Sequence, residues 1–207
     1  TQRKTLVDSE EIYFADGSVK TVIKESIRDA DLYIVQGFGN SSNNLSINDE
    51  VMSALSAFAA AHESDARNVA GLILLHPYAR QDKSDGREGV LAADVASMFE
   101  MYADHIITMD IHNTAIRGFY KKAKFDNLHA SRNILKYINE ETKLGSLDNL
   151  VVMAPDLGGA KRAEHYAENL EVPLVFSYKR RDYSCPNSVA SIEIVGDIKN
   201  KVVLMPD

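Results

Sequence analysis

Residues 71–75 read GLILL, residues 91–102 read LAADVASMFEMY, and residues 105–109 read HIITM. The first and third stretches are apolar runs of strand length, and the third is rich in β-branched residues. In the second stretch, apolar residues recur every three or four positions, which is the spacing of one helical face. A strand, a helix and a second strand in this order are typical of a βαβ unit, whose strands lie parallel in one sheet.

The same alternation continues along the chain. Further strands are predicted at residues 32–35, 150–154, 173–178, 191–195 and 201–205. Further helical faces are predicted at residues 51–58, 134–138 and 163–170. Because continuous apolar strands are typical of sheets that helices cover on both sides, we expect an α/β protein with doubly wound parallel sheets. The loop at residues 142–149 separates a predicted domain at residues 1–140 from a second at residues 141–207.

The first segment has a different pattern. EIYF at residues 11–14 and VKTVIK at residues 19–24 are extended runs, and Asp16 and Gly17 lie between them. An Asp-Gly pair between two such runs is a strong hairpin signal, because the tight turn needs residues that tolerate positive φ. We therefore expect a two-stranded flap that closes one edge of a sheet.

Composition argues against several classes of protein. The chain has 23 Lys and Arg against 30 Asp and Glu, and its net charge of −7 argues against a nucleic-acid binder that neutralises phosphates. Its longest strongly apolar runs, such as residues 72–75, fall far short of the ~20 residues of a membrane helix. The single cysteine, Cys185, has no partner for a disulfide or a thiolate metal site. We expect a soluble cytoplasmic protein that binds neither nucleic acid nor membrane.

A candidate anion site follows the predicted strand at residues 150–154. The sequence there is DLGGAKR, at residues 156–162, directly before a predicted helix. Paired glycines allow a tight turn, and the amides of the helix N-terminus then form an anion site. Asp156 could hold a divalent metal on that anion. In the alternative interpretation, the glycines only permit the turn and Asp156 only caps the helix.

Three further polar clusters follow predicted strands. HPYARQDK at residues 76–83 offers two cations and an amide to a polyphosphate and a base. DIH at residues 110–112 ends a strand whose alternation points Asp110 and His112 to the same side, as metal or phosphate ligands. KRR at residues 179–181 is a candidate lid that brings cations onto a developing phosphoryl charge. Each cluster is also consistent with an ordinary solvated loop. Because the carboxyl ends of parallel strands meet at one sheet edge, we expect the clusters to converge.

These motifs resemble those of the ribose-phosphate diphosphokinases, also called phosphoribosyl pyrophosphate synthetases, over nearly the whole chain. YARQDK at residues 78–83 is similar to the family's nucleotide loop. ITMDIH at residues 107–112, with GFY at residues 118–120, is similar to its Asp-Leu-His and Gly-Phe-Phe segment. APDLGGAKR at residues 154–162 is similar to its pyrophosphate loop, and VGDI at residues 195–198 to the segment before its ribose-5-phosphate loop. The resemblance implies two domains of phosphoribosyltransferase type.

The resemblance implies a reaction in nucleotide biosynthesis. The diphosphoryl group of ATP, with Mg²⁺, would pass to the C1 hydroxyl of ribose 5-phosphate, giving phosphoribosyl pyrophosphate and AMP. The family's ATP-binding positions match Phe14, Asp16, Arg80, Gln81, Asp82, Arg87 and His112. The first two would come from the flap of a neighbouring subunit, so the protein would be a homo-oligomer built from dimers, with a hexamer as the expected form.

The resemblance also implies which residues bind the diphosphoryl group that is transferred. The pyrophosphate loop matches Asp156, Leu157, Gly158 and Gly159. His112 and Asp156 would hold magnesium. Lys179 and Arg181 match the lid cations, and they are the candidate catalytic residues because such transfer depends on positioning and charge neutralisation.

Departures from the family pattern leave an alternative open. Ser18 stands where the family usually has Glu, and the family's first βα unit is missing before Thr1. Asp207 matches the first acidic residue of the ribose-5-phosphate loop, so we expect the second domain to be incomplete in this chain. The alternative is a non-catalytic, nucleotide-binding regulatory subunit of the same fold. A base-salvage phosphoribosyltransferase ranks last, because it gives no role to the YARQD string.

Overall fold

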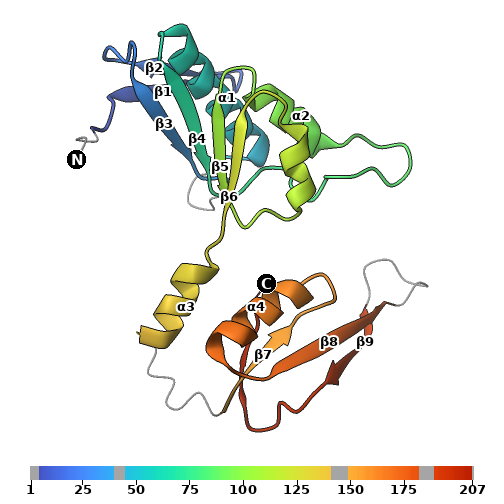
Figure 1. Cartoon of the computed structure of the whole chain (residues 1–207). Coiled ribbons are helices and arrows are strands. Elements are labelled where there is room, and N and C mark those ends of the chain that lie inside the picture. Colours follow the sequence, from blue (N-terminus) through green and yellow to red (C-terminus); the bar gives the residue numbers. More distant parts are fainter. Residues whose placement is uncertain (1–4, 40–44, 141–148, 182–188, 207) are drawn as a thin grey trace. The chain divides into compact units, whose positions relative to one another are not determined.

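The chain forms two compact units, Thr1–His129 and Ala130–Asp207 (Figure 1). The computed structural model describes residues 5–39, 45–140, 149–181 and 189–206, and of residues 179–181 and 189–192 it describes the backbone alone. The division falls one helix earlier than the predicted boundary after residue 140. The reason is that α3 (Ser131–Glu140) buries Leu135 and Ile138 in one cluster with Leu150 and thus belongs to the second unit.

The first unit is built on a four-stranded parallel sheet in the order β3-β4-β5-β6. The strands are β3 (Asp31–Gln36), β4 (Asn68–Ile73), β5 (His105–Met109) and β6 (Lys124–Leu128). One face of the sheet carries the buried side chains of Ile73, Ile106 and Phe125, which pack with residues of α1 (Ile47–Glu63) and α2 (Leu91–Phe99). This arrangement confirms the α/β class and the βαβ order expected from the alternating pattern.

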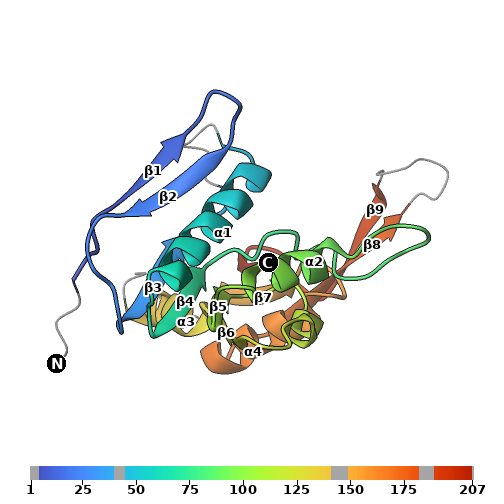
Figure 2. The same ribbon diagram turned by 90° about the horizontal axis from the view of Figure 1, so that it is seen from above.

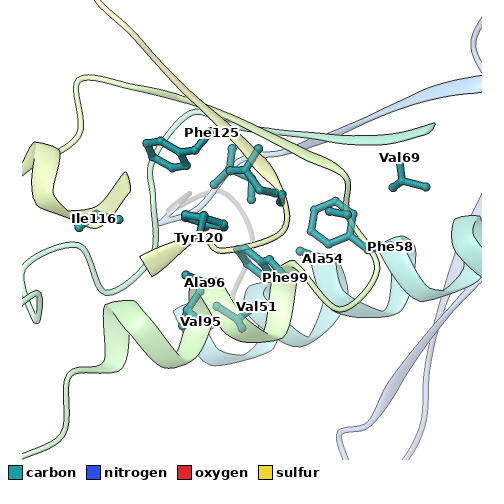
Figure 3. Packing of buried hydrophobic residues seen from close by; sticks show 14 of the residues in the cluster. Val51, Ala54, Phe58, Val69, Val95, Ala96, Phe99, Ile116, Tyr120 and Phe125 are labelled. Atoms are coloured by element: carbon teal, nitrogen blue, oxygen red, sulfur yellow. The ribbon is translucent and has the colours of Figure 1, made fainter. Parts of the chain in front are cut away.

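A tightly packed aromatic core joins the two helices to this sheet (Figure 3). The rings of Phe58 and Phe99 meet edge to face with their centroids 5.4 Å apart, and both side chains are fully buried. Burial of each contributes about 2 kcal/mol. Gly71 on β4 allows this approach, because a Cβ there would lie 2.6 Å from Phe58 Cζ.

The expected hairpin forms, but it closes no edge of a four-stranded sheet. β1 (Ser9–Tyr13) and β2 (Val19–Ile23) pair only with each other among the described strands, and they lie along α1 (Figure 2). The Thr21 amide donates to Ser56 Oγ at 2.8 Å, and the Ser53 hydroxyl donates to the Glu11 carboxylate. Hydroxyls of the buried Ser53 and the half-buried Ser56 on α1 therefore fix both strands of the hairpin on the helix.

The second unit has a four-stranded sheet in the order β10-β7-β8-β9. Its strands are β7 (Leu150–Ala154), β8 (Leu174–Arg181), β9 (Val189–Val195) and β10 (Val202–Leu204). All five residues of β7 are buried, and α4 (Ala160–Leu170) packs on it together with α3. β9 runs antiparallel to β8, contrary to the expectation of parallel strands throughout. The connection at residues 182–188 is too short for the crossover that a parallel pair requires.

Three details of the first unit differ from the predicted elements. β4 ends at Ile73, and Leu74 and Leu75 are exposed beyond it. β6 reads KFDNL and lacks the apolar run of a central strand, so the sequence pattern gave no sign of it. The 3₁₀ helix η1 (Thr114–Phe119) was also not predicted. β6 pairs with β5 and η1 packs against α2 and β6, so contacts with other elements rather than periodicity define the chain path.

Within the described residues, no helix has the length and apolar character needed to cross a membrane. The 17 residues of α1 include charged and polar side chains on its exposed face.

Candidate functional site

The loop between β4 and α2 encloses a hollow of about 350 Å³. The backbone amide of Gln81 donates to the Tyr78 carbonyl at 2.9 Å, and the backbone amide of Ala92, at the start of α2, donates to the backbone carbonyl of Gln81 at 3.2 Å. The loop therefore folds back on the helix that follows it. The hollow is lined by Arg80, Gln81, Lys83, Glu88, Gly89 and Leu91.

Charge in this hollow favours an anionic ligand. Arg80 and Lys83 supply two cations, whereas Glu88 supplies one carboxylate, which also accepts the Asp85 amide at 2.6 Å. Arginine and lysine are the usual partners of phosphate oxygens, and the Gln81 amide can both donate to and accept from a base. The structure thus brings Arg80 and Gln81 together, as predicted.

Two other predicted residues of this loop lie outside the lining of the hollow. Asp82 is half-buried and Arg87 is exposed, and neither contributes to the hollow. Conversely, Glu88, Gly89 and Leu91 line it without having been predicted. Their only sequence signal is their place directly before a helix that follows a strand and a polar loop.

The start of the loop is held by contacts to distant elements. Tyr78 has a φ of 57°, and its hydroxyl donates to Asn48 in the first turn of α1. His76 is buried, with Nδ1 2.8 Å from the Pro77 carbonyl oxygen and Nε2 2.8 Å from Tyr120 Oη. Burial lowers the pKa of His76 to about 4. The neutral imidazole is therefore the form present at neutral pH.

The DIH segment departs from the expected alternation. β5 ends at Met109, and Asp110 follows with a φ of 47°, so the strand pattern does not extend to His112. The Asp110 carboxylate accepts from His129 Nδ1 at 3.2 Å, whereas His112 is exposed. The prediction that alternation aligns Asp110 with His112 is wrong, because the backbone leaves the extended conformation between them.

Phe14 and Asp16 lie at the tip of the hairpin. The Phe14 ring is 47% exposed, and Lys20 Nζ lies 5.6 Å from its centroid. The Asp16 carboxylate accepts from the Ser18 hydroxyl at 2.6 Å and from the Ser18 amide at 2.9 Å. These bonds lower the pKa of Asp16. Gly17, with a φ of 85°, completes the predicted turn. Ser18 therefore closes the turn onto Asp16.

Residues 156–159 join β7 to α4 in the second unit. Asp156 Oδ1 accepts the Gly159 amide at 2.9 Å, and Gly159 directly precedes the helix. A Cβ at Gly159 would lie 3.0 Å from Pro155 Cδ, a tight contact that glycine avoids. Leu157 is 72% exposed at the tip of the loop. Asp156 therefore closes the turn before α4, but it does not cap the helix, whose N-cap residue Gly159 leaves α4 without a side-chain cap. The metal interpretation of Asp156 stays a prediction.

The candidate lid residues fall at the end of β8. Its backbone pairs Lys179 with Ile192 of β9, and the register shifts at Arg180 and Arg181. The side chains of Lys179 and Arg181 lie outside the described part of the chain, as does Cys185. Their predicted roles therefore stay predictions.

The described residues contain no group of three or more His, Cys, Asp or Glu side chains arranged to hold a metal ion. Mg²⁺ needs no such group, because it is commonly bound by one or two carboxylates together with substrate phosphates and water. The Asp156 carboxylate fits that chemistry. The His112 imidazole is a softer donor that Mg²⁺ favours less, so Asp156 is the better of the two predicted ligands.

Sequence comparison points to one family. The model for the N-terminal domain of ribose phosphate pyrophosphokinase matches residues 3–102. Ribose-phosphate pyrophosphokinase 2 of Schizosaccharomyces pombe is 36% identical over 199 residues, which cover 95% of this chain and 59% of the relative. Ribose-phosphate pyrophosphokinase 4 of Saccharomyces cerevisiae is 37% identical over 197 residues, covering 94% of this chain and 57% of the relative.

Structure comparison agrees. The crystal structure of phosphoribosylpyrophosphate synthetase from Mycobacterium smegmatis superposes with a TM-score of 0.84 and 30% sequence identity, covering 98% of this chain and 63% of that one. The chain thus spans about three fifths of the length of the proteins that it matches. By sequence and by fold, the chain belongs to the ribose-phosphate pyrophosphokinase family.

Proposed function

We propose that the protein is a ribose-phosphate pyrophosphokinase that transfers the diphosphoryl group of ATP to ribose 5-phosphate. The C1 oxygen of the sugar would bond to the β-phosphorus while the bond from that phosphorus to the α,β-bridging oxygen breaks. The bridging oxygen leaves with AMP, and the hydroxyl proton is released. One observation supports the proposal: the hollow after β4 is lined by Arg80, Lys83 and Gln81, whose two cations and side-chain amide suit a polyphosphate and a base.

The nucleotide site is assigned to the first unit. Arg80 and Gln81 would bind the nucleotide in the hollow, with Asp82 and Arg87 completing the loop around it. Phe14 and Asp16 would contact the adenine end from the hairpin of a neighbouring subunit. The exposure of the Phe14 ring supports this role, because an exposed aromatic side chain at a hairpin tip is available for stacking. The protein would then be a homo-oligomer built from dimers, a hexamer in its expected form.

The binding of the transferred diphosphoryl group is assigned to residues of the second unit and to His112. The loop at residues 156–159 would bind the pyrophosphate through its amides, and His112 and Asp156 would hold Mg²⁺. When bound, Mg²⁺ would neutralise charge on the phosphate oxygens. Lys179 and Arg181 would place two further cations on the developing charge, which is the main contribution a protein makes to phosphoryl-type transfer.

A non-catalytic nucleotide-binding subunit is the second candidate. The hydrogen bonds from Ser18 to Asp16 favour it, because they occupy the carboxylate that the first proposal assigns to the adenine end. Both candidates require ATP binding, and only the first requires turnover.

Calorimetric titration of the purified protein with Mg·ATP tests the binding that both candidates share. Arg80→Ala should weaken ATP binding about 10- to 100-fold, since a hydrogen bond to a charged group contributes about 1.5–3 kcal/mol. Arg28→Ala is the matched control, because the Arg28 guanidinium pairs with Asp65 on the surface. Failure of the wild-type protein to bind ATP would contradict both candidates.

Formation of AMP that depends on ribose 5-phosphate then separates them. The full-length protein should release AMP and phosphoribosyl pyrophosphate in equal amounts. ATP binding without this turnover would favour the non-catalytic subunit.

A further inference from the structure

We propose that His76 is a positioning residue for the nucleotide loop, fixed as the Nδ1-protonated neutral tautomer between the Pro77 carbonyl and the Tyr120 hydroxyl. The inference rests on the proposed function, which makes residues 78–83 the nucleotide loop. In this inference, the buried His76 holds Pro77, the residue directly before that loop, and Tyr120 holds the histidine.

The imidazole lies at the point where the loop leaves the sheet. β4 ends at Ile73, and His76 is 3% exposed four residues before Arg80. Nδ1 lies 2.8 Å from the Pro77 carbonyl oxygen, and Nε2 lies 2.8 Å from Tyr120 Oη. Both ring nitrogens are therefore used, one by the loop backbone and one by a neighbouring segment.

The partners determine the tautomer. A carbonyl oxygen can only accept a hydrogen bond, so Nδ1 must carry the proton. The other nitrogen of a neutral imidazole can only accept, so Nε2 accepts a hydrogen bond from the Tyr120 hydroxyl. Burial keeps the ring in this form, as the pKa of about 4 indicates. The direction of both bonds is thus fixed, which a flexible surface histidine does not achieve.

Tyr120 is itself held firmly. Its ring stacks on Phe125 of β6 with the centroids 4.8 Å apart, in the core that Figure 3 shows. The next two amides, of Lys121 and Lys122, donate to the Glu100 carboxylate at 2.7 and 2.9 Å. Glu100 ends α2, so the position of Tyr120 is tied to the same helix whose first turn closes the hollow.

The loop is therefore restrained at two places. His76 holds the Pro77 carbonyl, and the start of α2 holds the Gln81 carbonyl through the Ala92 amide at 3.2 Å. Arg80 lies between these two restraints. A side chain that must meet a phosphate benefits from such restraint, because less conformational freedom is then lost on binding.

A double variant separates positioning from simple core packing. In His76→Phe/Tyr120→Phe, both polar groups are replaced by apolar groups of similar shape, which is close to neutral for stability. The Pro77 carbonyl nevertheless loses its donor. We expect a moderately lowered unfolding midpoint, because the buried Pro77 carbonyl is left without its donor, together with an ATP KM raised about fivefold and a kcat within twofold of wild type. His105→Phe is the matched control, at a histidine of β5 that pairs with Asp126 of β6.

Two measurements made without nucleotide test the same inference. Imidazole nitrogen NMR of the wild-type protein at pH 7 should show His76 protonated at Nδ1 only. Amide exchange of residues 78–83 should be faster in the double variant and in Tyr120→Phe, whereas exchange of β6 stays unchanged.

The outcomes are distinct. A His76 ring protonated at Nε2, or a double variant with wild-type ATP KM and wild-type exchange in the loop, would overturn the inference. Failure of the wild-type protein to bind ATP would instead overturn the proposed function. The NMR and exchange results would then still decide whether His76 fixes the loop.

Discussion

Asp156 Oδ1 lies 2.9 Å from the Gly159 amide nitrogen, so the carboxylate closes the turn that leads into α4. The same carboxylate is the proposed magnesium ligand. The two roles make different demands, because the turn needs only an acceptor oxygen, whereas a hard cation favours a charged one.

Asp156→Asn separates these roles. The amide oxygen can still accept from Gly159, so the midpoint of thermal unfolding should stay the same, while the rate of AMP formation should fall at least about 100-fold. Asp156→Ala should lose the same activity and also destabilise the second unit by about 1 kcal/mol. Asp197→Asn is the control, since Asp197 also caps a turn by accepting the Lys199 amide. An Asn variant with full activity and unchanged Mg²⁺ dependence would show that Asp156 only closes the turn before α4.

Lys179→Ala tests the lid. Removal of one group that stabilises developing charge typically lowers kcat by about 100- to 1,000-fold. ATP affinity should stay nearly unchanged, because the ground state does not use this cation in the proposed mechanism. Steady-state kinetics together with calorimetric titration measure both quantities, and Lys199→Ala, at an exposed lysine of the same unit, is the control. Equal losses in kcat and ATP affinity would contradict a role confined to the transition state.

His76 gives the first unit a pH-dependent stability. Its pKa is about 4 in the folded protein against 6.5 for an ordinary histidine, so between these values the unfolded chain binds a proton that the folded chain does not. Stability should therefore fall by about 3 kcal/mol as the pH drops from 6.5 to 4. The carboxylates titrate alike in wild type and His76→Phe. The difference in unfolding free energy between the two proteins should therefore change by this amount over the same pH range. Parallel pH profiles of the two proteins would show that His76 is not buried in neutral form.

Gly71→Ala tests the aromatic core. The added Cβ would lie 2.6 Å from Phe58 Cζ and 3.0 Å from Ile106 Cδ1, so we expect a loss of about 1–3 kcal/mol. Gly118→Ala is the control, because a Cβ there meets no atom within 4 Å and should cost less than about 0.5 kcal/mol. Amide exchange of β4 and β5 reports the first unit separately from the second. Equal protection of these strands in both variants would contradict the packing described.

Local patterns were enough to predict most elements of the fold. β5 was expected at residues 105–109 and is observed at His105–Met109, and β7 was likewise predicted at its observed bounds. Both are apolar runs whose length and composition indicate a buried strand. The hairpin turn at Gly17 was equally readable, because the Asp-Gly pair meets a local conformational requirement.

The elements that sequence missed depend on contacts from elsewhere in the chain. β6 has no periodic apolar signal and exists as a strand because it pairs with β5. The hairpin was expected at a sheet edge, but Ser53 and Ser56 of α1 provide its hydrogen-bond partners. Neither docking partner could be inferred from the residues that dock.

The candidate site likewise has residues that the sequence predicted and residues that only the structure showed. Arg80 and Gln81 were predicted together because they share one short loop, and the structure places both on the hollow. Glu88 and Leu91 join them only because the Gln81 carbonyl accepts a hydrogen bond from the Ala92 amide at the start of α2. His76 looked like part of a polar loop, and its partner Tyr120 lies 44 positions away.

The sequence by itself determined the α/β class, the order of the strands and helices that carry a periodic apolar pattern, and the motifs that resemble one enzyme family, since these follow from local periodicity and from the side chains of single loops. Tertiary structure alone decided the direction of β9, the docking of the hairpin on α1, the end of the extended backbone before His112, and the pairing of His76 with Tyr120. The physical reason is that burial and hydrogen-bond satisfaction are properties of a whole packed unit, to which residues far apart in sequence contribute together.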